Sequence, residues 1–153
     1  MTGRRVGTAK ARMKWVVDAS AAAKWLAPEA ESAQADALLV HDLFVPDLVF
    51  AEVANILWKK QSRGEIDEAV AVAAARWLQH LPWRVVPSAA LMPAALALSV
   101  RLRHPACDCF YLALAVAQDS AVVTADRRLF KRCRQADAPD LHARVSWLAA
   151  MPA

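Results

Sequence analysis

Short apolar runs alternate along the chain with longer segments whose apolar residues recur every three or four positions. The short runs are typical of strands buried on both faces, and the longer periodicity is typical of helices that pack on one side. Strands are therefore expected at residues 15–17, 43–45, 84–86, 121–124 and 144–147. Helices are expected at residues 20–27, 29–40, 48–63, 65–80, 91–103, 105–118 and 127–135. For the helix at 48–63, Asp47 is expected as the N-cap and Gly64 as the stop.

This order of elements predicts an α/β fold. Strands that are separated by helices pair in parallel, with the helices on both faces of the sheet. We expect a three-layer α/β/α sandwich around a central parallel sheet of four to five strands. The pattern begins at Met13 and the chain has 153 residues, which is the usual size of one domain. Residues 13–153 are therefore expected to form a single domain.

Residues 1–12 differ from the rest, because they are basic and have no apolar periodicity. They are interpreted as a leader or a tag outside the folded domain. Four of the nineteen basic residues lie there, which leaves fifteen to balance fifteen acidic residues. The net charge of +4 therefore does not by itself predict a nucleic-acid partner.

Composition excludes several classes of protein. Only three glycines occur, so a glycine-rich loop that cradles a nucleotide phosphate is not expected. No run of eighteen apolar residues predicts a membrane span, and the interrupted N-terminal segment does not resemble a signal peptide. The three cysteines lack the paired spacing of a zinc site. We expect a cytoplasmic protein without a disulfide framework.

Acidic residues stand at the ends of predicted strands. Asp18 and Asp126 follow the first and fourth strands, and Asp108 lies in the first turn of the helix that leads into the fourth. Sites in parallel sheets form beyond the carboxyl ends of the strands, so these three acids are expected at one edge. Glu52 lies inside an apolar helical segment with no basic residue before Lys59, and it therefore needs a partner.

Four carboxylates in one pocket would repel one another unless a cation balanced them. Oxygen ligands of this kind suit Mg²⁺ or Mn²⁺, which can activate water and neutralise a phosphodiester. The pattern therefore indicates a metal-dependent nuclease or phosphatase. Three polar residues are candidates for supporting the carboxylates, because they lie beside the strand ends or on the face of Glu52: Ser20, Asn55 and Thr124.

Each acid also has a simpler explanation. Asp18 and Asp126 precede helices and could serve only as N-caps, and Asp108 could simply complement a helix dipole. Glu52 is harder to explain in this way, because an unpaired charge costs several kcal/mol when it is buried. These explanations do not account for the expected convergence of all four acids in one place.

Four segments resemble, in order and spacing, the PIN domains of VapC-like toxins. They are Val16-Val17-Asp18-Ala19-Ser20, Ala51-Glu52-Val53-Ala54-Asn55, Asp108-Cys109-Phe110-Tyr111-Leu112-Ala113-Leu114-Ala115 and Val123-Thr124-Ala125-Asp126-Arg127-Arg128-Leu129. The resemblance extends from Met13 to Trp147. Each motif is weak alone, and together they are specific.

The resemblance implies a Mg²⁺- or Mn²⁺-dependent endoribonuclease that is the toxin of a toxin-antitoxin pair. It implies that Asp18, Glu52, Asp108 and Asp126 are the catalytic metal ligands. It also implies an RNA substrate, a homodimer and a cognate antitoxin that inhibits the enzyme. The basic residues after Asp126 then become candidate contacts to the RNA backbone: Arg127, Arg128 and Lys131.

Two alternative functions stay open at this point. A magnesium-dependent phosphatase usually carries Asp-x-Asp after its first strand, whereas this chain has Asp18-Ala19-Ser20. A non-catalytic PIN-like module that binds RNA or protein would not need the four acids. The tryptophans on predicted helices are more typical of a core or a subunit interface than of base stacking.

Overall fold

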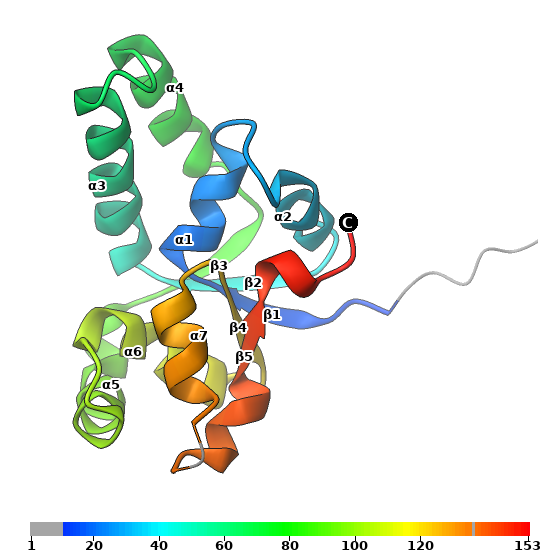
Figure 1. Cartoon of the computed structure of the whole chain (residues 1–153), viewed down its shortest axis with the longest axis vertical. Coiled ribbons are helices and arrows are strands. Elements are labelled where there is room, and N and C mark those ends of the chain that lie inside the picture. Colours follow the sequence, from blue (N-terminus) through cyan, green and yellow to red (C-terminus); the bar gives the residue numbers. More distant parts are fainter. Residues whose placement is uncertain (1–10, 136) are drawn as a thin grey trace, which may run out of the picture.

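The structure is a computed structural model that describes residues 11–135 and 137–153. Five parallel strands form one sheet in the order β3-β2-β1-β4-β5 (Figure 1). The strands are β1 (Lys14–Val17), β2 (Asp42–Pro46), β3 (Trp83–Val86), β4 (Ala121–Thr124) and β5 (Val145–Trp147). The predicted three-layer α/β/α fold is confirmed. The sheet has five strands, the upper end of the four to five that the sequence predicts. The predicted leader lies outside the described residues except for Ala11 and Arg12.

Helices connect the strands at the places that the periodicity predicts. They are α1 (Ala19–Ala22), α2 (Ser32–Leu38), α3 (Leu48–Ser62), α4 (Glu68–Leu78), α5 (Ser88–Leu102), α6 (Ala106–Ala117) and α7 (Arg127–Cys133). Short 3-10 segments are η1 (Ala23–Trp25), η2 (Pro139–Arg144) and η3 (Leu148–Ala150). Among the described residues, no helix has the length and apolar character needed to cross a membrane.

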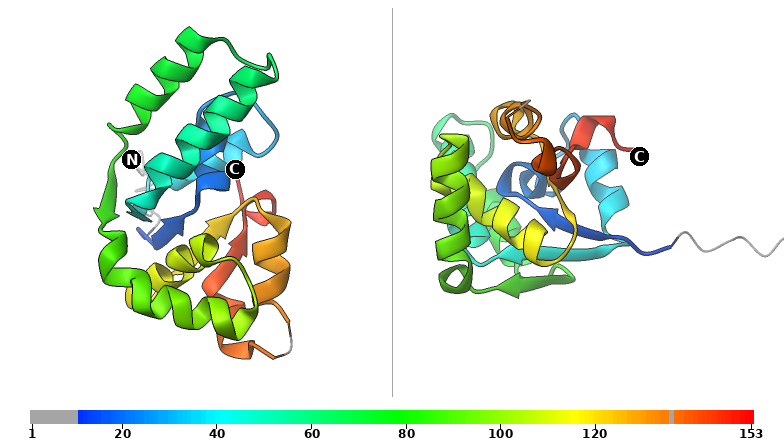
Figure 2. Two further views of the ribbon diagram at one scale, coloured as in Figure 1. Left: turned by 90° about the vertical axis from the view of Figure 1, so that its left-hand side faces the viewer. Right: turned by 90° about the horizontal axis from the view of Figure 1, so that it is seen from below.

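The central strands are apolar because both faces of the sheet are covered. Val16 and Val17 of β1 and Val122 and Val123 of β4 are completely buried. Each such side chain stabilises the fold by roughly 1.5–3 kcal/mol. Helix α6 packs across β2, β1 and β4, and α5 packs on α6 at the outside of the molecule (Figure 2). This packing fixes the start of α6 relative to the ends of β1 and β4.

Helices α3 and α4 form a hairpin at the other end of the molecule (Figure 1). Gly64 follows α3 with a φ of 72°, a left-handed conformation that glycine adopts without strain. The predicted stop at Gly64 is thus confirmed. Lys60, near the end of α3, pairs with Glu29 in the loop before α2 and so ties α3 to the α1–α2 region.

One predicted helix cap is wrong. Asp47 was expected to cap the helix that follows it, but its side chain makes no such bond. The carboxylate accepts instead from the backbone N–H of Ser88, at 2.9 Å, and from the Ser88 hydroxyl. This contact caps α5, so the helix begins at Ser88 rather than at the predicted Leu91. Ser88 in turn accepts from the N–H of Leu48, at 3.3 Å, which joins the starts of α3 and α5.

Candidate functional site

Asp18 lies at the carboxyl end of β1, beside the end of β4. Its backbone N–H donates to the carbonyl of Val123 at 3.2 Å, which continues the ladder between the two strands. Its side chain is almost fully buried, with 4% of the residue exposed. Because β1 and β4 are parallel neighbours, Asp18 and Asp126 leave the sheet at the same edge.

Two hydroxyl groups join these strand ends. Ser20 Oγ donates to Asp18 Oδ1 at 2.7 Å and accepts from the N–H of Ala125 at 2.9 Å. Thr124 Oγ1 lies 3.3 Å from Ser20 Oγ and accepts from the N–H of Asp126 at 2.9 Å. Ser20 and Thr124 therefore lie where the sequence predicts polar support for the carboxylates.

Glu52 projects from α3 toward α6. The Tyr111 hydroxyl donates to Glu52 Oε2, and Tyr111 is 1% exposed. Burial, followed by the charge of Glu52, raises the pKa of Tyr111, so its hydroxyl stays protonated and remains a donor. Sequence reasoning missed Tyr111. Its signal is a lone tyrosine in an apolar helix, since a buried hydroxyl needs a partner.

Asp108 lies in the first turn of α6 and faces the same pocket. Its Oδ2 is 2.6 Å from Nε2 of His104, whose side chain is 9% exposed. The carboxylate is the acceptor, so the ring nitrogen donates. Sequence reasoning gave His104 no role. It lies outside α6, and Pro105 separates it from the start of that helix.

One pocket of about 210 Å³ collects all four carboxylates. Its lining residues are Asp18, Ala19, Ser20, Glu52, Asn55, Ile56, Asp108, Tyr111 and Asp126. Burial raises the pKa of Asp18 to about 6, although hydrogen bonds from Thr124 and Ser20 oppose the shift and the charge of Asp108 adds to it. Burial and the charge of Asp108 also raise the pKa of Glu52. The surroundings of Asp18 and Glu52 thus disfavour the ionised form of both carboxyl groups.

The simpler roles considered for these acids are also present. Asp18 Oδ1 accepts from the N–H of Ala21 at 2.9 Å, and Asp126 Oδ1 accepts from the N–H of Arg128 at 2.8 Å. Both residues are therefore N-caps. Each cap uses only Oδ1, and no cap involves Oδ2, so capping and metal binding do not exclude each other.

Basic side chains of the described residues neutralise little of the negative charge of the pocket. Within residues 11–135 and 137–153, no lysine or arginine forms an ion pair with Asp18, Glu52 or Asp108. Asp126 has only Arg128, whose Nε is 3.9 Å away and whose side chain is 87% exposed. An exposed pair at this distance contributes little. The described part of the chain therefore leaves most of the charge of the pocket unbalanced.

The donor set fits a hard divalent cation that keeps part of its water shell. In the described part of the chain, no three His, Cys, Asp or Glu side chains already stand where they could hold one ion. Mg²⁺ usually binds through one or two carboxylates and retains several waters, so a ready-made cage is not required. The pocket offers carboxylate, hydroxyl and amide oxygens, which Mg²⁺ and Mn²⁺ prefer.

The other predicted residues lie on α3 and α7. Asn55 lines it from α3. Arg127, Arg128 and Lys131 are exposed on α7, directly after Asp126, and the Arg127 guanidinium stacks 5.7 Å from the centre of the Trp147 ring. Of the tryptophans considered for an interface, Trp83 is buried and packs edge-on against Trp25 at 6.0 Å, whereas Trp58 and Trp77 are exposed.

Comparisons with known proteins agree with this geometry. The PIN domain family model matches residues 15–135. The chain is 36% identical over 124 residues to ribonuclease VapC3 of Pyrobaculum aerophilum, an alignment that covers 78% of this chain and 95% of that protein.

Two crystal structures share the fold. The protein PAE2754 of Pyrobaculum aerophilum is similar at a TM-score of 0.63 and 24% identity, over 79% of this chain and 80% of that one. VapBC2 of Rickettsia felis, bound to a DNA fragment from its promoter, is similar at a TM-score of 0.60 and 13% identity, over 88% of this chain and 98% of that one. The chain therefore belongs to the PIN-domain family, among its VapC-like members.

Proposed function

We propose that this protein is a Mg²⁺- or Mn²⁺-dependent endoribonuclease and the toxin of a toxin-antitoxin pair. The observation that carries the proposal is the single pocket lined by Asp18, Glu52, Asp108 and Asp126, whose lining contains no basic side chain among the described residues. The VapC3 relative, whose name describes a ribonuclease, supports RNA as the substrate.

In this proposal the four carboxylates hold the cation, and the surrounding donors keep them in position. A bound divalent ion supplies an activated water and neutralises charge on the phosphodiester. Ser20 and Thr124 hold Asp18, while Tyr111 holds Glu52. Asn55 is free to hydrogen-bond a metal-bound water or a substrate phosphate from α3.

The RNA backbone is expected to reach the pocket along α7. Arg127, Arg128 and Lys131 extend from the helix that begins at Asp126, so a phosphate bound there lies next to the carboxylates. Basic side chains at this place offset the repulsion between the RNA and the acidic pocket.

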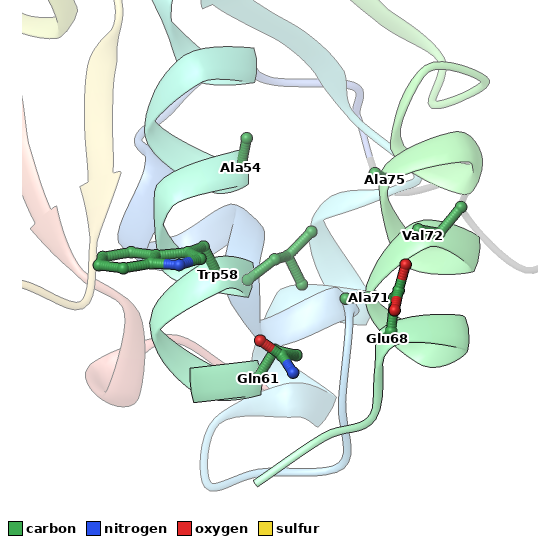
Figure 3. Close-up of a pocket in the computed structure, with 8 residues that line it drawn as sticks. Ala54, Trp58, Gln61, Glu68, Ala71, Val72 and Ala75 are labelled. Carbon is green, nitrogen blue, oxygen red and sulfur yellow. The ribbon is translucent and has the colours of Figure 1, made fainter. Parts of the chain in front are cut away.

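The antitoxin is expected to bind beside the same pocket. Helices α3 and α4 enclose a mainly apolar groove of about 310 Å³, with Ala54 and Trp58 on one side and Ala71, Val72 and Ala75 on the other (Figure 3). Helix α3 carries Glu52 toward the carboxylate pocket and Ala54 toward this groove, so an apolar segment seated in the groove lies close to the carboxylates. The similarity to the VapBC2 structure supports an antitoxin partner.

A homodimer and a cytoplasmic location complete the proposal. Met92, Leu96 and Val100 are spaced by four residues on α5 and are 60%, 59% and 71% exposed, a row that a second copy can cover. Cys107, Cys109 and Cys133 are free thiols, which fits a reducing compartment such as the cytoplasm.

The proposal is tested with the variants Asp18→Asn and Asp126→Asn. Each keeps a side chain that can cap a helix and removes one negative charge from the pocket. We expect the wild type to cleave RNA with Mg²⁺ or Mn²⁺ and to stop when the ion is chelated, while both variants stay folded and inactive. A phosphatase substrate, p-nitrophenyl phosphate, is the control and should not be hydrolysed. Equal RNA cleavage by wild type and variants would refute the proposal.

A further inference from the structure

His104 lies behind the carboxylate pocket rather than in its lining. Its side chain is 9% exposed, and its Nε2 reaches Asp108 Oδ2 at 2.6 Å. Asp108 itself lines the pocket with its side chain 28% exposed. The contact uses Oδ2, and no hydrogen bond from the described residues involves Oδ1.

The backbone of His104 is fixed by the end of α5. Arg103 adopts a left-handed conformation, with φ 49° and ψ 49°, which reverses the chain after the helix. The N–H of His104 then donates to the carbonyl of Ser99 at 3.2 Å, and the N–H of Arg103 donates to that of Val100 at 3.4 Å. These two bonds form a Schellman motif.

Two further features hold the same residue. The Ser99 hydroxyl donates to the His104 carbonyl at 2.6 Å, so α5 holds both backbone groups of His104. Pro105 follows with a φ of −52° and leads directly into α6. The backbone of His104 therefore has a defined place between the end of α5 and the start of α6, from which the ring reaches Asp108.

Asp108 needs such a support more than an ordinary helix residue does. Its charge raises the pKa of both Asp18 and Glu52, so the three carboxylates repel one another across the pocket. No lysine or arginine in the described part of the chain pairs with Asp108. In the absence of the donor at Oδ2, repulsion favours rotation of the carboxylate away from its neighbours.

We propose that His104 is a positioning residue, which holds Asp108 with one oxygen turned to the pocket and thereby sets the affinity of the site for a divalent cation. The inference rests on the proposed function of the pocket as a cation site. Carboxylates that bind metals are commonly oriented by such a hydrogen bond, and loss of the partner typically weakens metal binding about 10–100-fold.

The test compares His104→Met, which keeps the bulk but has no N–H donor, with His104→Gln, whose terminal amide can donate to Asp108. Mn²⁺ binding is measured by calorimetry, and thermal unfolding is measured in chelator. His80→Ala, at an exposed histidine after α4, is the control. We expect about 10–100-fold weaker Mn²⁺ binding in His104→Met, near-normal binding in His104→Gln and in the control, and similar unfolding temperatures in all.

Two results would overturn this inference and leave the proposed function intact. One is an unchanged Mn²⁺ affinity in His104→Met. The other is equally weak Mn²⁺ binding in His104→Met and His104→Gln, which would mean that packing of the ring matters instead of the hydrogen bond. Absence of Mn²⁺ binding in the wild type would overturn the proposed function as well, so the two failures are distinguishable.

Discussion

Asp18 combines a structural role and a site role in one side chain. Its Oδ1 caps α1 and accepts from Ser20, while its burial at the end of β1 disfavours the charge that these hydrogen bonds favour. Burial is the larger effect, because it raises the pKa to about 6. The ionised carboxylate of Asp18 therefore destabilises the fold when no cation is bound.

This shift predicts how the stability of the cation-free protein depends on pH. The ordinary pKa of Asp18 is 3.8, so between that pH and about 6 the folded protein retains a proton that the unfolded chain loses. Stability contributed by Asp18 is present below pH 3.8 and is lost as the pH rises to about 6, by on the order of 3 kcal/mol.

Urea unfolding in chelator, at about pH 4 and about pH 7, measures this effect when the wild type is compared with Asp18→Asn. The variant cannot lose this proton, so it should gain stability relative to the wild type at the higher pH. A constant difference between the two proteins across this range would contradict the assignment.

Tyr111→Phe tests the support of Glu52. The variant keeps the buried ring and removes the hydroxyl that donates to Glu52 Oε2, so the fold should persist while the carboxylate loses its anchor. We expect RNA cleavage to need more Mg²⁺, with a loss of about 10–100-fold at limiting Mg²⁺ that saturating Mg²⁺ partly restores. A rate profile against Mg²⁺ that superimposes on that of the wild type would show that the hydroxyl is dispensable.

The sequence predicted the four acids that the structure gathers in one pocket, but not Tyr111 and His104, which contact Glu52 and Asp108. Asp18 and Asp126 follow recognisable strands, and Glu52 is conspicuous in an apolar helix. The contacts of Tyr111 and His104 depend on how α6 is placed against α3 and how α5 turns into α6. Local patterns do not encode these distances, although the isolated hydroxyl of Tyr111 hinted that a partner exists.

At the scale of elements, α7 connects the pocket to the surface that we propose for RNA. It begins at Asp126 and carries three exposed basic residues, Arg127, Arg128 and Lys131. Replacing all three by alanine in the inactive Asp18→Asn background should weaken RNA binding at low salt. The slope of log affinity against log salt should flatten by about 0.7 for each phosphate that no longer has a basic partner.

Fluorescence anisotropy of a labelled RNA over a range of KCl concentrations gives this slope. Arg76→Ala, at an exposed position on α4, is the matched control and should leave the slope unchanged. If the triple variant and the control have the same slope as the parent, α7 does not bind RNA.

Helix boundaries show where local patterns stop being sufficient. Apolar periodicity found the strands and the α-helices of the described residues, because burial on one or two faces dictates it, but it did not find the 3-10 segments η2 and η3. The start of α5 was missed by three residues, since Asp47, which is distant in sequence, caps Ser88 from the end of the neighbouring strand β2. Contacts of this kind arise only when the two helix starts meet in the folded chain.

At the scale of the whole molecule, the proposed homodimer depends on α5. Leu96→Glu places a charge in the middle of the exposed apolar row and should reduce the mass in light scattering from that of two chains to that of one. Val40→Glu, at a site 64% exposed outside this helix, is the control and should leave a dimer. A monomeric wild type, or a Leu96→Glu variant that still forms dimers, would contradict the proposal.

We propose that the four carboxylates form one cation site at the edge of the sheet. Crystals soaked in Mn²⁺ and measured by anomalous scattering test it most directly. We expect a peak in the pocket, about 2 Å from oxygens of at least one or two of Asp18, Glu52, Asp108 and Asp126, and we expect this peak to disappear in Asp126→Asn. An empty pocket at saturating Mn²⁺, or a peak that persists unchanged in the variant, would contradict it.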